Sequence, residues 1–82
     1  MSHDYRYSIV VRRNDPSDRA VGVLREWDAP DGGGTYGETY TRDGEWKHSN
    51  IREDIERASN IYNRLVASDA VTVGQFIAAR RP

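Results

Sequence analysis

The segment Ser49–Val66, SNIREDIERASNIYNRLV, is the longest stretch whose apolar residues recur at helical spacing. Its recurring apolar positions are Ile51, Ile55, Ala58, Tyr62 and Leu65. Residues spaced in this way line one face of a helix, because a helix turns once in about 3.6 residues. Ser49 and Asn50 are both good N-cap residues. We therefore predict one helix over residues 51–66, against whose apolar face the rest of the chain packs.

Upstream of this helix, the chain alternates between apolar and polar residues with the period of a β-strand. We predict strands over residues 5–13, 20–27 and 35–41, and a short fourth strand over residues 45–48. Pro16 lies among asparagine, aspartate and serine residues, which is typical of a turn. The first two strands therefore run antiparallel, and the four strands form a meander.

The loop between the third and fourth strands decides which aromatic residues face each other. A three-residue loop with Gly44 in the left-handed conformation sets Tyr40 opposite Trp46, whereas a two-residue Asp-Gly turn sets Thr41 there. We favour the first, because it forms an aromatic cross-strand pair of the kind that contributes roughly 0.2–1 kcal/mol.

After the long helix, residues 67–70 interrupt the apolar period, since serine and aspartate compete for local hydrogen bonds. We predict a short helix over residues 73–80, capped by Thr72. The whole chain, residues 1–82, then forms a single α+β domain. Its antiparallel sheet of three to four strands carries the long helix on one face. The inward residues of that face are Tyr7, Ile9, Val11, Val21, Val23, Tyr40 and Trp46.

The composition excludes several classes of protein. The 82 residues contain no cysteine, which removes disulfides, thiolate metal sites and cysteine nucleophiles. Twelve basic and thirteen acidic residues leave a net charge of −1, so the chain has no overall field that attracts nucleic acid. It has no apolar run long enough to span a membrane, and its first residues lack the pattern of a signal peptide. We expect a cytoplasmic protein with no membrane partner.

A tyrosine-rich first strand is followed by Glu38-Thr39-Tyr40, by Gly44-Glu45-Trp46 with Ser49, and by a helix. This layout is similar to that of small uncharacterised proteins of high-GC bacteria. The resemblance points to a bacterial protein and implies no activity.

Candidate catalytic and metal-binding residues each have a simpler explanation. His48 precedes Ser49, but adjacent residues rarely present their side chains to one another, and capping explains the serine. Asp28, Asp31 and Glu38 flank a run of three glycines, yet they lack the spacing of a calcium loop. We therefore expect no catalytic activity, no metal site and no cofactor.

The sheet face away from the predicted helix is the candidate binding surface. The binding residues that we predict on it are Arg6, Val10, Arg12, Leu24 and Glu26. Apolar residues rimmed by arginine and an acid are the composition of a modest contact surface for another protein or a second copy of the chain. Scattered aliphatic residues on an open face are also ordinary, and this alternative stays open.

Nucleic acid is the second candidate partner, because Tyr5 and Tyr7 are suited to stacking on bases. Strand alternation argues against this use, since it places both tyrosines on the same face as Ile9 and Val11, which we expect in the core. A basic patch for such a partner would consist of Arg12, Arg13, Arg80 and Arg81. The sequence therefore favours a protein-interaction or regulatory module, with a nucleic-acid-binding protein as the alternative.

Overall fold

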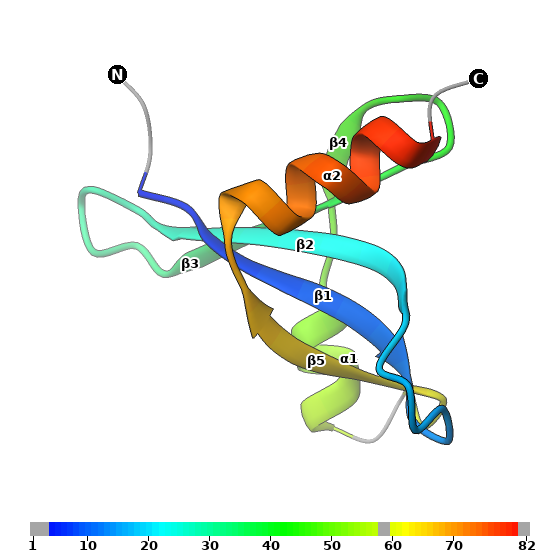
Figure 1. The fold of residues 1–82 in the computed structure, drawn as a ribbon. Helices are drawn as coiled ribbons and strands as arrows, with labels where there is room; N and C mark the ends of the chain where they lie inside the picture. Colours follow the sequence, from blue (N-terminus) through cyan, green and yellow to red (C-terminus); the bar gives the residue numbers. More distant parts are fainter. Residues whose placement is uncertain (1–3, 58–59, 81–82) are drawn as a thin grey trace.

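The computed structural model describes residues 4–57 and 60–80, and its strands form one antiparallel sheet in the order β4-β3-β2-β1-β5 (Figure 1). The elements of this part of the chain are β1 (Arg6–Arg12), β2 (Ala20–Asp28), β3 (Thr35–Tyr40), β4 (Trp46–His48), α1 (Ile51–Glu56), β5 (Asn63–Ser68) and α2 (Ala70–Arg80). The predicted α+β class and the meander of the first four strands are confirmed. A fifth strand, which the sequence did not predict, extends the sheet beyond β1.

The turn between β1 and β2 is held by Asp15. Its carboxylate accepts hydrogen bonds from the backbone N–H of Ser17 at 2.9 Å and from the hydroxyl of the same residue at 2.6 Å. The hydroxyl bond, followed by the backbone bond, lowers the pKa of Asp15. Next to Gly22 the register between the two strands shifts, which leaves Val21 as a bulge in β2.

The hairpin of β3 and β4 has the predicted three-residue loop. Tyr40 pairs with Trp46, and their ring centroids lie 5.4 Å apart at an interplanar angle of 71°. The N–H of Thr41 donates to the carbonyl of Glu45 at 2.8 Å, which closes the loop. Gly44 has a φ of 83°, the left-handed conformation that the loop requires.

The prediction of one helix over residues 51–66 is wrong beyond its first turns. The helix α1 ends at Glu56, and the N–H of Arg57 donates to the carbonyl of Glu53 at 2.9 Å. Residues 63–68 form β5 instead of the second half of the helix. Ala58, part of the predicted helical stripe, lies outside the described residues.

Strand β5 takes its place by pairing with the edge of β1, where Ile9 lies opposite Val66. That edge carries a row of backbone donors and acceptors that need partners. Leu65 lies opposite Val10 and Val66 opposite Ile9, so the two large apolar residues of β5 fall on opposite faces of a sheet that has a helix on each side. The long-range pairing therefore outweighs a local helical period.

The second helix, α2, is longer than the predicted 73–80 and begins at Ala70. Its N-terminus is capped by Asp69, whose carboxylate accepts a hydrogen bond from the backbone N–H of Thr72 at 2.7 Å. The predicted cap, Thr72, is therefore a residue of the first turn. The same hydrogen bond is the main cause that lowers the pKa of Asp69.

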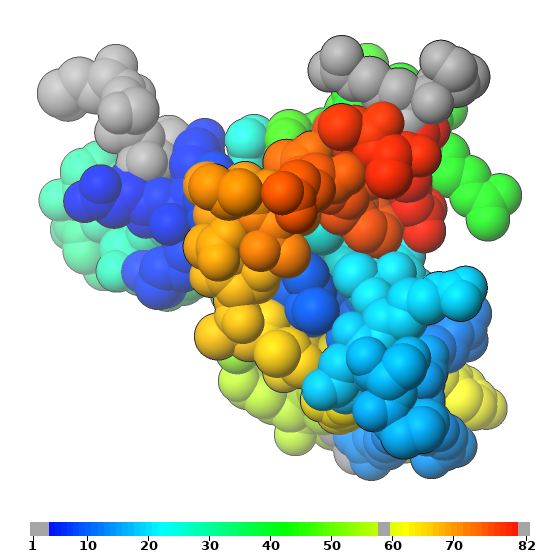
Figure 2. All heavy atoms as spheres, in the orientation of Figure 1, coloured from blue at the N-terminus to red at the C-terminus, as the bar shows by residue number. Residues whose placement is uncertain are grey.

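Each face of the sheet has its own helix. We call them the α2 face and the α1 face. Along β1 and β2 the α2 face carries Tyr7, Ile9, Val11, Val23 and Trp27, and the α1 face carries Arg6, Ser8, Val10, Leu24 and Glu26. Figure 2 shows α2, in orange and red, lying across the first of these faces. The apolar face is thus covered as predicted, but by α2 and not by residues 51–66.

The face that the sequence left open to solvent is the one under α1. Val10 is 5% exposed and Leu24 is 1% exposed, so both belong to the core, and the prediction that they are exposed is wrong. The buried apolar residues of the described chain are Val10, Val11, Val23, Leu24, Ala29 and Val73. Four of them lie on the sheet, Val11 and Val23 on the α2 face and Val10 and Leu24 on the α1 face, while Val73 belongs to α2 and Ala29 follows β2.

Candidate binding cleft

A cavity of about 460 Å³ lies between α1 and the α1 face of the sheet. Its sheet side is formed by Arg6 and Ser8 from β1, Glu26 from β2 and Gly37 from β3. These residues share one face because Arg6 pairs with Glu26, and Glu26 pairs with Gly37. Its helix side is formed by Arg52, Glu53 and Glu56, together with Ser49 and Asn50. We call this cavity the α1 cleft.

Gly37 allows the chain that leads into α1 to pass close over β3. The N–H of Ser49 donates to the carbonyl of Gly37 at 3.0 Å. A Cβ atom at Gly37 would lie 3.2 Å from the carbonyl oxygen of Ser49, which is tighter than an ordinary contact. The Ser49 hydroxyl then accepts a hydrogen bond from the N–H of Ile51 at 3.2 Å and so supports the helix start, the role predicted for it.

Glu26 and Arg52 form the ion pair at the centre of the cleft. The Nε–H of Arg52 donates to both carboxylate oxygens of Glu26, at 2.9 and 2.8 Å. The Glu26 side chain is only 8% exposed, whereas that of Arg52 is 44% exposed. The hydrogen bond to Glu26 raises the pKa of Arg52, so the guanidinium keeps its charge at neutral pH.

A second ion pair stands at the rim. Both terminal nitrogens of Arg6 donate to the carboxylate of Asp28, each at 3.1 Å, in the forked geometry that arginine forms with carboxylates. The hydroxyl of Thr35 donates to the same carboxylate at 3.0 Å. The bond from Arg6, followed by that from Thr35, lowers the pKa of Asp28. Arg6 is therefore already occupied by an anion of its own chain.

Ser8 lies in the cleft wall and is 5% exposed. Within residues 4–57 and 60–80, its hydroxyl has no hydrogen-bond partner. The hydroxyl oxygen is not one of the fully buried atoms of the described chain that lack a partner, which are those of Thr41 and Asn63, so it borders the open cavity and is available to a ligand that enters the cleft.

The structure places the five predicted binding residues on one face of the sheet, and three of them, Arg6, Leu24 and Glu26, line the cleft. Val10 is buried on the α1 face, and Arg12 is exposed at the far end of β1; both lie outside the cleft lining. Sequence reasoning missed Ser8 and Arg52. Strand alternation already puts Ser8 on this face, but the period of the longer predicted helix puts Arg52 on its solvent side.

The alternative basic patch is divided between different parts of the fold. The backbone N–H of Arg13 donates to the carbonyl of Tyr62 at 2.8 Å, next to β5. The guanidinium of Arg80 donates to the carbonyl of Val21 in β2 at 3.2 Å and lies 4.4 Å from the ring centroid of Phe76. Arg12 is exposed at the end of β1, and Arg81 lies outside the described residues.

The α2 face carries an aromatic row beside α2. Trp27 lies 5.4 Å from Tyr5 and 5.7 Å from Tyr36, measured between ring centroids. The guanidinium of Arg25 lies between the rings of Tyr5 and Trp46, at 4.6 and 4.3 Å. Tyr5 and Tyr7, which we expected in the core, are half-buried, and Arg25 is held by Glu38 at 2.7 Å.

A second cavity, of about 440 Å³, lies between the β3–β4 loop and the C-terminal half of α2. It is lined by Tyr40, Thr41, Arg42, Asp43, Gly44, Ile77 and Arg80. The Thr41 hydroxyl oxygen is buried there without a hydrogen-bond partner among the described residues. Over the same part of the chain, no group of three or more histidine, aspartate or glutamate residues converges as a metal site would require.

No helix within residues 4–57 and 60–80 is long and apolar enough to cross a membrane. No protein-family model, curated protein or solved structure matches this chain.

Proposed function

We propose that the chain is a small, non-catalytic binding module that holds a segment of another protein in the α1 cleft. One observation carries the proposal: two buried polar residues, Glu26 and Ser8, line an open cavity. Binding sites in proteins are concave and combine apolar walls with a few convergent polar groups.

Stability alone does not explain these polar residues. Few apolar residues of the described chain are buried, so each interior position matters to a domain of this size. Taking the Glu26 carboxylate out of water costs free energy, which its pairing with the exposed Arg52 offsets, and an apolar residue of similar volume often stabilises such a position more. Recognition of a partner is a reason to keep Glu26 and Arg52 at such a position.

The charges of the cleft favour a protein partner over nucleic acid. The cleft is lined by two arginines, Arg6 and Arg52, and by three glutamates, Glu26, Glu53 and Glu56, so it has a surplus of negative charge. Nucleic-acid binding depends on arginine and lysine residues that are free to neutralise phosphates.

The described residues of the cleft give no support to a catalytic role. Nucleophilic catalysis needs a nucleophile bonded to a base, with a third group that orients the base. In the described chain the Ser8 hydroxyl is bonded to no base, and the Glu26 carboxylate is tied to Arg52. This arrangement supports a binding role for the cleft.

A peptide selection followed by NMR tests the proposal. Peptides selected from a random library on the immobilised protein are titrated into the isotope-labelled chain. We expect amide shifts at Ser8, Glu26 and Gly37, and weaker binding by Ser8→Val. Gln75→Ala, on the exposed surface of α2, is the control and should bind as the parent does.

Two results would contradict the proposal. One is that no peptide is enriched, or that the shifts fall away from the cleft. The other is binding of oligo(dT) that weakens steeply as salt is raised, which is the signature of phosphate contacts and would favour the nucleic-acid alternative.

A further inference from the structure

We infer that the α1 cleft takes a cationic side chain of the partner, a lysine ammonium or an arginine guanidinium, which binds Glu26 and the hydroxyl of Ser8. The inference rests on the proposed function and names the chemistry that the cleft recognises. It is carried by the unused hydrogen-bonding capacity of two buried residues and by the charge around them.

The first step is the capacity of Glu26 to accept more hydrogen bonds. A carboxylate offers about four lone-pair positions. Arg52 uses one position on each oxygen, through the single donor Nε–H. The side chain is 8% exposed and lines the cavity, so its remaining positions are open only to a group that enters the cleft.

Ser8 adds a second acceptor in the same wall. In the sheet, Ser8 lies two residues along β1 from Arg6, the cross-strand partner of Glu26, which makes Ser8 and Glu26 diagonal neighbours on one face. Its hydroxyl has no partner in the described part of the chain. An ammonium has three donors and a guanidinium five, so either can bond to both residues at once.

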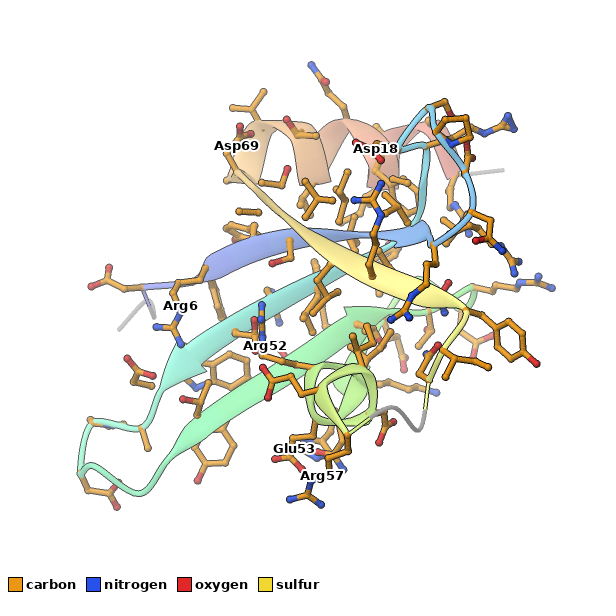
Figure 3. The ribbon with its side chains drawn as sticks, turned by 90° about the horizontal axis from the view of Figure 1, so that it is seen from below. Arg6, Asp18, Arg52, Glu53, Arg57 and Asp69 are labelled. Carbon is orange, nitrogen blue, oxygen red and sulfur yellow. The ribbon has the colours of Figure 1, made fainter. Side chains whose placement is uncertain are left out.

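The charges around these acceptors favour a cation. Arg6 is held by Asp28, and the pKa of Arg52 is raised first by Glu26 and then by Glu56. Figure 3 shows Arg52 pointing from α1 back across the cleft, while Glu53 lies beside Arg57 on the outer side of the helix. Because Arg6 is neutralised by Asp28, Arg52 is left to balance two carboxylates of the cleft, those of Glu26 and Glu56.

Arg52 acts as an internal competitor for the same carboxylate. Its side chain is 44% exposed, so it can leave Glu26 and remain solvated. Removing it should strengthen the binding of a cationic ligand. An anion-binding cleft would behave in the opposite way, because Arg52 would then supply the contact.

The probes are three blocked tripeptides, acetyl-Gly-Lys-Gly-amide and its arginine and glutamate counterparts, together with n-butylammonium. Affinity is measured by NMR titration of the full chain at low salt. We expect the lysine and arginine peptides to shift the amides of Ser8 and Glu26, and the glutamate peptide to leave them unchanged. Glu26→Gln should weaken cation binding roughly tenfold or more, as expected for a lost charged hydrogen bond.

Arg52→Gln should bind the cationic peptides more tightly than the parent. If it does not fold, the double variant Glu26→Gln/Arg52→Gln, which leaves no unpaired charge, should fold and bind neither cation. Parent-like cation binding by Glu26→Gln or by the double variant would overturn the inference. Stronger binding of the glutamate peptide would overturn it as well.

These outcomes are separate from the test of the proposed function. If library peptides without a basic residue occupy the cleft, the inference is wrong and the proposed function stands. If n-butylammonium binds at Glu26 but no peptide does, the cleft binds cations, and the proposal of a protein partner is wrong. If neither binds, both are wrong.

Discussion

At Gly37, the chain that leads into α1 passes so close over β3 that there is little room for a side chain. A Cβ atom there would lie 3.2 Å from the Ser49 carbonyl oxygen and 3.6 Å from side-chain atoms of Glu26 and Leu24. We predict that Gly37→Ala pushes the start of α1 away from β3 and costs roughly 1–3 kcal/mol, the usual range for overpacking. Urea denaturation followed by circular dichroism measures the change.

Gly74 is the matched control for this substitution. It lies inside α2, and a Cβ atom there would meet nothing within 4 Å. Gly74→Ala should therefore stabilise the chain by about 0.5–1 kcal/mol, because alanine favours the helix more than glycine does. Equal stability of Gly37→Ala and the parent would show that the segment through Ser49 moves without cost.

At the scale of elements, the sequence pattern predicts correctly those strands and turns that depend on neighbouring residues in the chain. The alternation of β1 and β2 and the three-residue loop at Gly44 were sufficient to predict the Tyr40–Trp46 pair correctly. The segment after Glu56 could not be predicted in the same way. Its residues fit a helical stripe or a strand, and the choice depends on the free edge of β1, some fifty residues earlier in the chain.

The same limit applies to the candidate site. Strand alternation alone puts Arg6, Leu24 and Glu26 on one face, and these residues line the cleft. Arg52 could not be added, because the predicted helix was too long and was placed on the other face. The side of a short helix that meets the sheet follows from tertiary packing and not from its own six residues.

Strand β5 leads to a prediction about hydrogen exchange. The N–H of Arg13 donates to the carbonyl of Tyr62. This bond shows which residues of β5 point their N–H groups at β1 and which point them away. By alternation, the amides of Arg64, Val66 and Ser68 point at β1, while those of Asn63, Leu65 and Ala67 point to the open edge.

We expect the amides of Arg64, Val66 and Ser68 to exchange slowly and those of Asn63, Leu65 and Ala67 to exchange quickly, as read by NMR. Alternation with a period of two distinguishes an edge strand from a helix, in which successive amides are all bonded. Uniformly slow exchange across residues 63–68 would contradict the assignment of β5 and would indicate a helix there instead.

At the scale of the whole molecule, the sheet is the middle layer between two helices, and both of its faces contribute to the core. Val11 and Val23 are buried on the α2 face, and Val10 and Leu24 on the α1 face. Each half of this core is small, because α1 covers its face with only two turns and leaves the cleft beside it. The loss of one large buried side chain should therefore lower the free energy of unfolding of the whole domain.

Leu24 is the largest of the fully buried side chains and lies next to the cleft. We predict that Leu24→Ala costs roughly 2–5 kcal/mol, because it removes buried apolar surface and leaves a cavity that a rigid sheet cannot close. Small domains are stable by only about 5–15 kcal/mol, so the variant should unfold at a far lower urea concentration.

Val71→Ala is the control: Val71 is exposed on α2, and its loss should change the free energy of unfolding by no more than about 0.5 kcal/mol. A cost below about 1 kcal/mol for Leu24→Ala would mean that α1 does not seal this face, and that Leu24 belongs to an open contact surface instead of the core.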